Sequence, residues 1–241
     1  MLSWFKKKRE QGPKVVGRSP GGSPIVRYGG EEFAGHPMGF AAEETEGYAE
    51  ERERGYEALF GESAEVLHEM VPFVPHVDVF QYPPTAERDF WTLATSGMSD
   101  LPMTLPRGVP REYRRGELIF YCDEPRPVYC ELLRVMAHFP HDNKTWLGPG
   151  HTMPNGDPPA PLFEDTPDLD SLVFSASIVS PDNTLAERLV LNGDPVSFLW
   201  VVPITAAECE FKLQKGMDAL YDLFDEVEHP HVFTGNRESY V

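Results

Sequence analysis

Residues 90–103 read Phe90-Trp91-Thr92-Leu93-Ala94-Thr95-Ser96-Gly97-Met98-Ser99-Asp100-Leu101-Pro102-Met103. The first five of these residues are mainly apolar or aromatic, which predicts a strand buried in a sheet. The residues from Thr95 to Asp100 then place a glycine, small hydroxyl side chains and one carboxylate where that strand ends. Because the end of a rigid strand can present polar groups to a partner, this segment is a candidate binding site.

The other strands are predicted by alternation and by apolar runs. Side chains alternate with a period of two residues in residues 77–82, 172–179 and 196–202. This alternation predicts a strand in each range. Residues 118–122 are apolar on both alternating faces, as are residues 90–94, which is typical of strands covered on both sides. The turn Asn192-Gly193-Asp194-Pro195 precedes the last run, so residues 172–179 and 196–202 are predicted to form a hairpin-type pair.

Apolar residues with helical spacing occur in three segments of the chain. Together with the predicted strands, these helices indicate an α+β fold. Residues 45–70 are predicted as packing helices, in which Ser63 caps a second piece carrying Val66, Leu67 and Met70. A second helix begins near Pro127 and is expected to end at Pro140. The last helix begins at the capping box Thr205-Ala206-Ala207-Glu208 and is expected to run to about Val227. We therefore expect a single domain over residues 44–241, with a central mixed β-sheet covered by helices.

The first 43 residues differ in composition from the rest of the chain. They combine a basic cluster with repeated Gly, Pro and Ser, and are poor in apolar side chains. Such a segment cannot offset the entropy of ordering, so a flexible basic N-terminal tail is predicted for residues 1–43.

The net charge narrows the classes of partner. Residues 1–27 carry a charge of +6 and the remainder carries −24, which together give −18. A body this acidic repels phosphate backbones, so direct nucleic-acid binding is not expected and a basic protein partner fits better. Acidity that serves only solubility is the alternative.

Three cysteines without a Cys-x-x-Cys pair indicate a reducing compartment, since an odd number without close spacing does not suggest a disulfide framework. The chain shows no apolar core of a signal peptide and no run of about 20 apolar residues that could span a membrane. The sequence therefore predicts a cytoplasmic protein.

Motifs for catalysis or cofactors are weak. His138, His141 and His151 are close in sequence and are the only candidate metal ligands, but their spacing does not match a helical zinc motif. Gly97-Met98-Ser99-Asp100-Leu101 lacks the second glycine of a hydrolase nucleophile elbow. No glycine-rich phosphate loop occurs, and no cofactor is expected.

Asp100 and Glu117 are the candidate binding carboxylates, with Ser99 and Met98 beside them. At the ends of neighbouring strands, the two acids would raise each other's pKa and attract a cationic side chain of a partner. The alternatives are a local turn bond for Asp100 and an exposed strand-edge charge for Glu117.

From about Val77 to Leu223 the chain resembles the Suppressor of fused domain family. The resemblance rests on the order and spacing of several segments: Gly97-Met98-Ser99-Asp100, Gly116-Glu117-Leu118, Glu131-Leu132-Leu133, His141-Asp142-Asn143-Lys144-Thr145-Trp146, Gly150-His151 and Phe198-Leu199-Trp200-Val201-Val202. It implies a non-enzymatic protein-binding domain. In the animal members an extended peptide is clamped between two lobes and its His meets two acids, whose matching positions here are Asp100 and Glu117.

This chain is about half as long as the animal proteins and lacks residues for their second lobe, so a clamp does not follow from the resemblance. Compact members resemble bacterial proteins thought to neutralise a cognate toxin, which implies an immunity-type role and a partner such as a basic toxin or effector. Two other functions stay open: a metal-dependent hydrolase that uses the loop histidines, and a structural adaptor.

Overall fold

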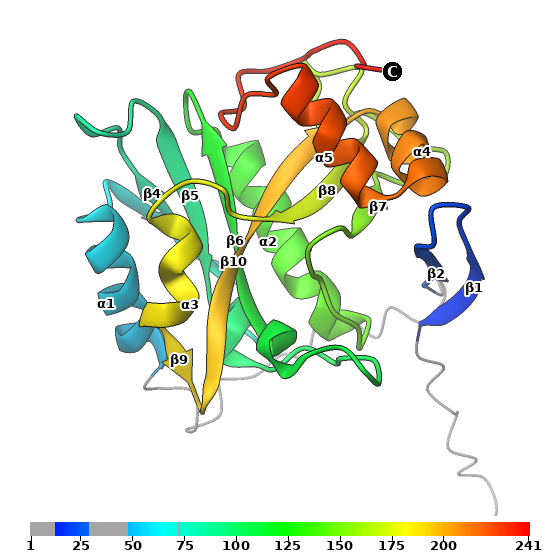
Figure 1. Ribbon diagram of the computed structural model, residues 1–241. Helices are drawn as coiled ribbons and strands as arrows, with labels where there is room; N and C mark the ends of the chain where they lie inside the picture. The colour runs from blue at the N-terminus through cyan, green and yellow to red at the C-terminus, as the bar shows by residue number, and fades with distance from the viewer. Residues whose placement is uncertain (1–12, 29–47, 72) are drawn as a thin grey trace, which may run out of the picture.

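The computed structural model describes residues 13–28, 48–71 and 73–241 (Figure 1). The strands are β1 (Lys14–Arg18), β2 (Pro24–Arg27), β3 (Glu65–Leu67), β4 (Asp78–Tyr82), β5 (Trp91–Ser96), β6 (Arg115–Cys122), β7 (Thr152–Pro154), β8 (Ser171–Ala176), β9 (Val190–Leu191) and β10 (Asp194–Ile204). The helices are α1 (Tyr48–Phe60), α2 (Pro127–Asp142), α3 (Leu185–Arg188), α4 (Ala206–Lys215) and α5 (Met217–Glu226). In the described part of the chain, no helix is both long and apolar enough to span a bilayer.

A mixed sheet forms the centre of the molecule. Its strands follow the order β3-β4-β5-β6-β10-β8-β7, and β9 pairs with the beginning of β10. Strands β6 and β10 are parallel, and the other pairs are antiparallel. The predicted α+β fold with a central mixed sheet and a single domain is confirmed.

Helices cover both faces of this sheet, and each face has its own core. Helices α1, α3 and α5 supply Tyr56, Leu185 and Phe224 to one cluster, whereas Leu133 of α2 lies in the cluster on the other side (Figure 1). Neighbouring residues of β6 alternate between the two clusters, as the pleat of a strand requires. The predicted burial of residues 118–122 on both faces is therefore confirmed.

The segment after α1 differs from the prediction. Residues Glu65–Leu67 form strand β3 at one edge of the sheet, where Val66 lies opposite Phe80 of β4. The second helical piece predicted from Ser63 to Met70 is therefore wrong, because pairing with β4 overrides a short helical pattern. Met70 is almost fully exposed, so it packs no helix onto the core.

The ends of two helices also differ from the prediction. Pro140 does not end α2, which continues to Asp142, since Asn143 and Thr145 donate backbone hydrogen bonds to Phe139 and Pro140. The last helix is divided at Gly216, whose φ of 98° ends α4 before α5 begins. The capping box between Thr205 and Glu208 is confirmed, with both reciprocal bonds formed.

Strands β8 and β10 are antiparallel neighbours, as predicted, but residues 177–193 separate them. These residues contain α3 and β9, and the turn at Asn192 and Gly193 joins β9 to β10. The predicted pair is therefore present, whereas the predicted turn closes a different and shorter hairpin.

Residues 13–28, within the segment predicted as a tail, form the two-stranded hairpin of β1 and β2. Its turn is held to the end of α4, where Gly21 donates a 2.8 Å hydrogen bond to Leu213. The remaining residues of segment 1–43 lie outside the described ranges, and the division of the chain at residue 43 stays a prediction.

Candidate functional site

The turn after β5 is built around one glycine. Gly97 has a φ of 132°, and a Cβ atom added there would lie 1.8 Å from the carbonyl oxygen of His76. Only glycine fits this approach without moving the backbone. The chain then makes a single 3₁₀ turn over Met98–Asp100, in which Asp100 donates to the carbonyl of Gly97.

The carboxylate of Glu117 on β6 stabilises this turn through hydrogen bonds. Its carboxylate accepts hydrogen bonds from the hydroxyls of Thr95 and Ser99, at 2.7 and 2.6 Å, and from the amides of Gly97 and Ser99, at 3.0 and 2.9 Å. The residue has no exposed surface. Glu117 is therefore neither an exposed edge charge nor a group that a partner can reach in this conformation.

Arg52 of α1 supplies a cation to the same site. Its guanidinium donates to the hydroxyl of Ser96 at 2.9 Å, pairs with the carboxylate of Asp100, and lies 3.8 Å from the carboxylate of Glu117. The side chain is 4% exposed. The chain itself thus provides the charge that the two acids were expected to take from a partner.

Sequence reasoning missed Arg52, although a weak signal was present. Arg52 lies one helical turn before Tyr56, and both belong to the buried side of α1. A charged residue on an apolar helix face needs a buried counter-ion, so its position could have suggested an internal pair.

Asp100 is the most accessible of the four predicted binding residues, with 12% of its side chain exposed. Burial raises the pKa of its carboxyl to about 6, even though Arg52 acts in the opposite direction. Arg115 of β6 donates to the carbonyl oxygens of Ser99 and Asp100, at 2.5 and 2.8 Å, and so fixes the backbone of the turn.

Met98 and Ser99 are fully buried. The carbonyl of Met98 accepts a 2.9 Å hydrogen bond from the Nε2 atom of His141, which ties the turn to α2. The structure therefore brings Met98, Ser99, Asp100 and Glu117 together, and leaves only Asp100 with surface at which a partner could begin to bind. Their role in partner binding stays a prediction.

The three candidate metal histidines have separate contacts. The Nε2 atom of His138 lies 2.7 Å from a carboxylate oxygen of Glu69, whereas His141 binds the turn and His151 packs edge-on against Trp146. Burial lowers the pKa of both His141 and His151 to about 4. Among the described residues, no group of three or more His, Cys, Asp or Glu side chains is arranged to hold a metal ion.

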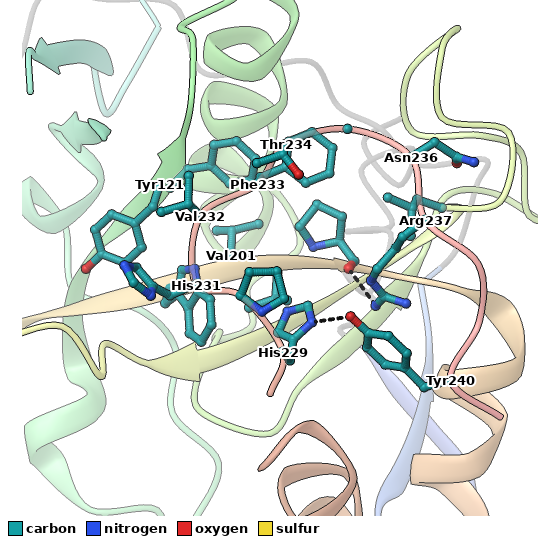
Figure 2. Close-up of a pocket in the computed structure, with 17 residues that line it drawn as sticks. Tyr121, Val201, His229, His231, Val232, Phe233, Thr234, Asn236, Arg237 and Tyr240 are labelled. Carbon is teal, nitrogen blue, oxygen red and sulfur yellow. Dashed lines mark hydrogen bonds between the residues drawn. The ribbon is translucent and has the colours of Figure 1, made fainter. Parts of the chain in front are cut away.

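A cavity of about 150 Å³ lies under the C-terminal segment (Figure 2). Several polar groups of its lining have partners within the chain: His229 lies 3.0 Å from the hydroxyl of Tyr240, and Arg237 donates to the carbonyl of Pro203 and to the buried carboxylate of Glu208. The contacts of Arg237 with Glu208 fix the C-terminal segment to α4.

Comparisons with known proteins agree with this architecture. The sequence matches the family described as Suppressor of fused protein over residues 74–238. The structure is similar to a suppressor of fused homologue from Neisseria gonorrhoeae, with 20% identity, a TM-score of 0.58, and coverage of 80% of this chain and 97% of that chain. It is also similar to a chain of the Sufu–Fu complex, with 12% identity, a TM-score of 0.54, and coverage of 80% and 90%.

At these identities, the two structural similarities show a shared fold. A comparison with curated protein sequences finds no match. The family match, however, includes most of the sheet, both parallel central strands and the turn at residues 97–100. Because this match extends over more than half of the sequence, the chain belongs to the Suppressor of fused family.

Proposed function

We propose that this protein binds and sequesters a basic protein partner, without catalysis. The family match supports protein binding, and a protein of this fold is seen in the Sufu–Fu complex. A bacterial toxin neutralised by its cognate immunity protein is the partner class we favour. The buried free cysteines Cys122, Cys130 and Cys209 fit a reducing compartment, which supports a cytoplasmic site of action.

We propose a basic partner because of the way charge is distributed over the domain. Most arginines of the domain are paired with the chain's own carboxylates: Arg52 with Asp100, Arg88 with Asp182, Arg111, Arg114 and Arg115 with Asp194, Arg126 with Asp165, Arg134 with Glu131, and Arg237 with Glu208. The net charge of −18 is therefore carried by acids in excess of these pairs. Such a surface attracts a basic protein and speeds its encounter.

Affinity capture tests this proposal. The full chain, immobilised through its C-terminus, is exposed to lysate of its native cells, and bound proteins are identified by mass spectrometry. We expect one basic protein that, once purified, binds the chain directly. Its affinity should fall about tenfold or more between 50 and 500 mM salt, because salt screens complementary surface charges.

Three results would contradict the proposal. A captured protein of acidic charge, or binding that does not respond to salt, would remove the electrostatic basis for the partner. Failure to capture any protein that binds directly would favour the hydrolase alternative. Immunity function is tested separately, since co-expression with this chain should restore growth of cells that produce the captured toxin.

A further inference from the structure

The hairpin of β1 and β2 is exposed over most of its length. Every residue of β1 and three of the four residues of β2 are exposed. The two strands pair only with each other, so neither outer edge of the hairpin has a neighbour among the described strands. Figure 1 shows the hairpin beside α4 and outside the layers of the domain. An isolated two-stranded hairpin is only marginally stable in water, so contact with another surface would stabilise it.

The hairpin is attached to the domain at two places. Its turn lies against the junction of α4 and α5, where Gly21 donates to the carbonyl of Leu213 and a Cβ atom added to Gly21 would lie 2.5 Å from the nitrogen of Gly216. After β2, the hydroxyl of Tyr28 lies 3.2 Å from the hydroxyl of Thr145. These contacts hold the hairpin next to the beginning of α5 and leave its strands exposed.

The hairpin carries cations without counter-ions, whereas most arginines of the domain are paired. Lys14, Arg18 and Arg27 are exposed, and none of them forms an ion pair within the described ranges. Lys14 lies directly opposite Arg27 in the antiparallel register. Like charges at opposite positions of a strand pair are destabilising, so an anionic surface placed against the hairpin would relieve the repulsion.

The hairpin also exposes aliphatic side chains. Val15, Val16 and Ile25 are 64%, 54% and 40% exposed. Ile25 lies two residues before Arg27, so these two side chains share one face of β2. Exposed apolar side chains that are grouped together and rimmed by charges mark an interaction surface. The hairpin therefore fits a partner that is acidic and is not fully polar.

The outer face of α5 carries the opposite charge. Asp218, Asp222, Asp225 and Glu226 are exposed on this helix, and in the part of the chain that the structure describes none of them is ion-paired. Helix α5 begins directly after the junction that contacts the turn of the hairpin. A basic surface and an acidic surface therefore lie next to each other on this chain.

Adjacent surfaces of opposite charge make a self-complementary patch. In a two-fold dimer both subunits use the same patch, and each contact occurs twice. A patch with a basic half and an acidic half fits this symmetry, because the basic half of one copy meets the acidic half of the other. Complementary charges of this kind favour association and fix its register.

We propose that two copies of this chain form a dimer in which the hairpin of each copy lies on α5 of the other. The exposed strands and aliphatic side chains of the hairpin are covered in this dimer, and its cations face the acids of α5. The inference concerns self-association, so it stands or fails independently of the proposed basic partner.

Sedimentation velocity of the full chain tests the dimer. We expect a monomer–dimer equilibrium whose dissociation constant rises at least about tenfold between about 50 and 500 mM salt, because salt screens the complementary charges. A chain that is monomeric up to about 1 mM, or that associates independently of salt, would overturn the proposal.

Charge reversal on the two surfaces identifies the contact. Lys14→Glu with Arg27→Glu reverses the hairpin, and Asp222→Lys with Glu226→Lys reverses the helix. Each double variant alone should dimerise at least about tenfold more weakly than the wild type. An equimolar mixture of the two should form a heterodimer, because every basic surface again meets an acidic one. A mixture that stays monomeric would overturn the assignment of the two surfaces.

The matched controls reverse charges elsewhere. Arg107→Glu with Arg188→Glu changes the net charge as the hairpin variant does, and Glu53→Lys with Glu57→Lys reverses two exposed acids at the same spacing on α1. Both controls should dimerise like the wild type, and equal weakening would show that net charge alone controls association. Binding of the hairpin to phosphatidylglycerol vesicles by a chain that remains monomeric would assign this surface to lipid and overturn the dimer.

Discussion

At the scale of single residues, the centre of the candidate site is a buried cluster of one cation and two acids. Arg52, Asp100 and Glu117 are nearly or fully withdrawn from water. Moving charges out of water costs several kcal/mol for each ion, and only mutual pairing with additional hydrogen bonds offsets that cost. Glu117 obtains these bonds from the turn, whereas Asp100 depends on Arg52.

Removal of the cation is expected to destabilise the protein strongly. Arg52→Leu should lower the free energy of unfolding by about 3–5 kcal/mol, because two buried carboxylates lose their counter-ion. Urea denaturation at pH 7 measures this change. Arg54→Leu is the control, since Arg54 is exposed on the same helix and should change stability by no more than about 0.5 kcal/mol. Equal effects of the two variants would contradict the internal ion pair.

At the scale of elements, short connections determine where strands and helices begin and end. Strand β5 ends at a turn that requires glycine, α4 begins at a capping box, and Gly216 separates α4 from α5. The start of α4 depends on two capping side chains, whereas the other two connections each depend on a glycine. The turn at Gly97 is the most constrained of them, because a neighbouring backbone carbonyl occupies the place of its Cβ atom.

Gly97→Ala is expected to lower the free energy of unfolding by roughly 3 kcal/mol or more, from both backbone strain and the clash with His76. Gly108→Ala is the matched control, because Gly108 has a φ of 92° but no atom within 4 Å of an added Cβ. The control should lose only about 1–2 kcal/mol through strain. Thermal and urea unfolding measure the stability of both variants. Similar losses in free energy of unfolding would show that the clash with His76 does not contribute.

At the scale of the whole molecule, burial of neutral histidines links stability to pH. Burial lowers the pKa of His141, His151 and His229 to about 4, from an ordinary value of 6.5. The unfolded chain therefore binds protons more readily than the folded chain, and stability is lost as the pH falls from about 6.5 towards 4. Asp100 acts in the opposite direction: since its pKa is raised to about 6, its contribution is lost as the pH rises from about 4 to 6.

The three histidines together destabilise the folded protein at pH 5 by more than Asp100 stabilises it. We therefore expect the protein to be less stable at pH 5 than at pH 7. The loss should be about 2 kcal/mol for each histidine, partly offset by Asp100. Urea midpoints measured at both pH values test this expectation. In His141→Gln the difference between the two pH values should be smaller, and an unchanged difference would show that His141 does not contribute.

Several features of the protein could be predicted from neighbouring residues alone. The alternation in residues 77–82 and the double-sided apolar run at 118–122 identified β4 and β6, because strand faces repeat every two residues. The capping box at Thr205 was predictable for a similar reason, since its two partners are three residues apart. Asp100 and Glu117 were selected as a pair through the family resemblance, and both lie close to the guanidinium of Arg52.

The remaining features depend on residues that the fold brings together over long distances in sequence. Arg52 lies 48 residues before Asp100, and their pairing exists only because α1 packs over the end of β5. Residues 65–67 form a strand because β4 lies beside them, and Glu117 is buried because Thr95, Gly97 and Ser99 surround it. Strand faces, apolar burial and helix caps follow patterns of neighbouring residues along the chain, so the sequence determined them. The burial and pairing of charged side chains depend on the neighbours that the sheet provides, so only the tertiary structure decided them.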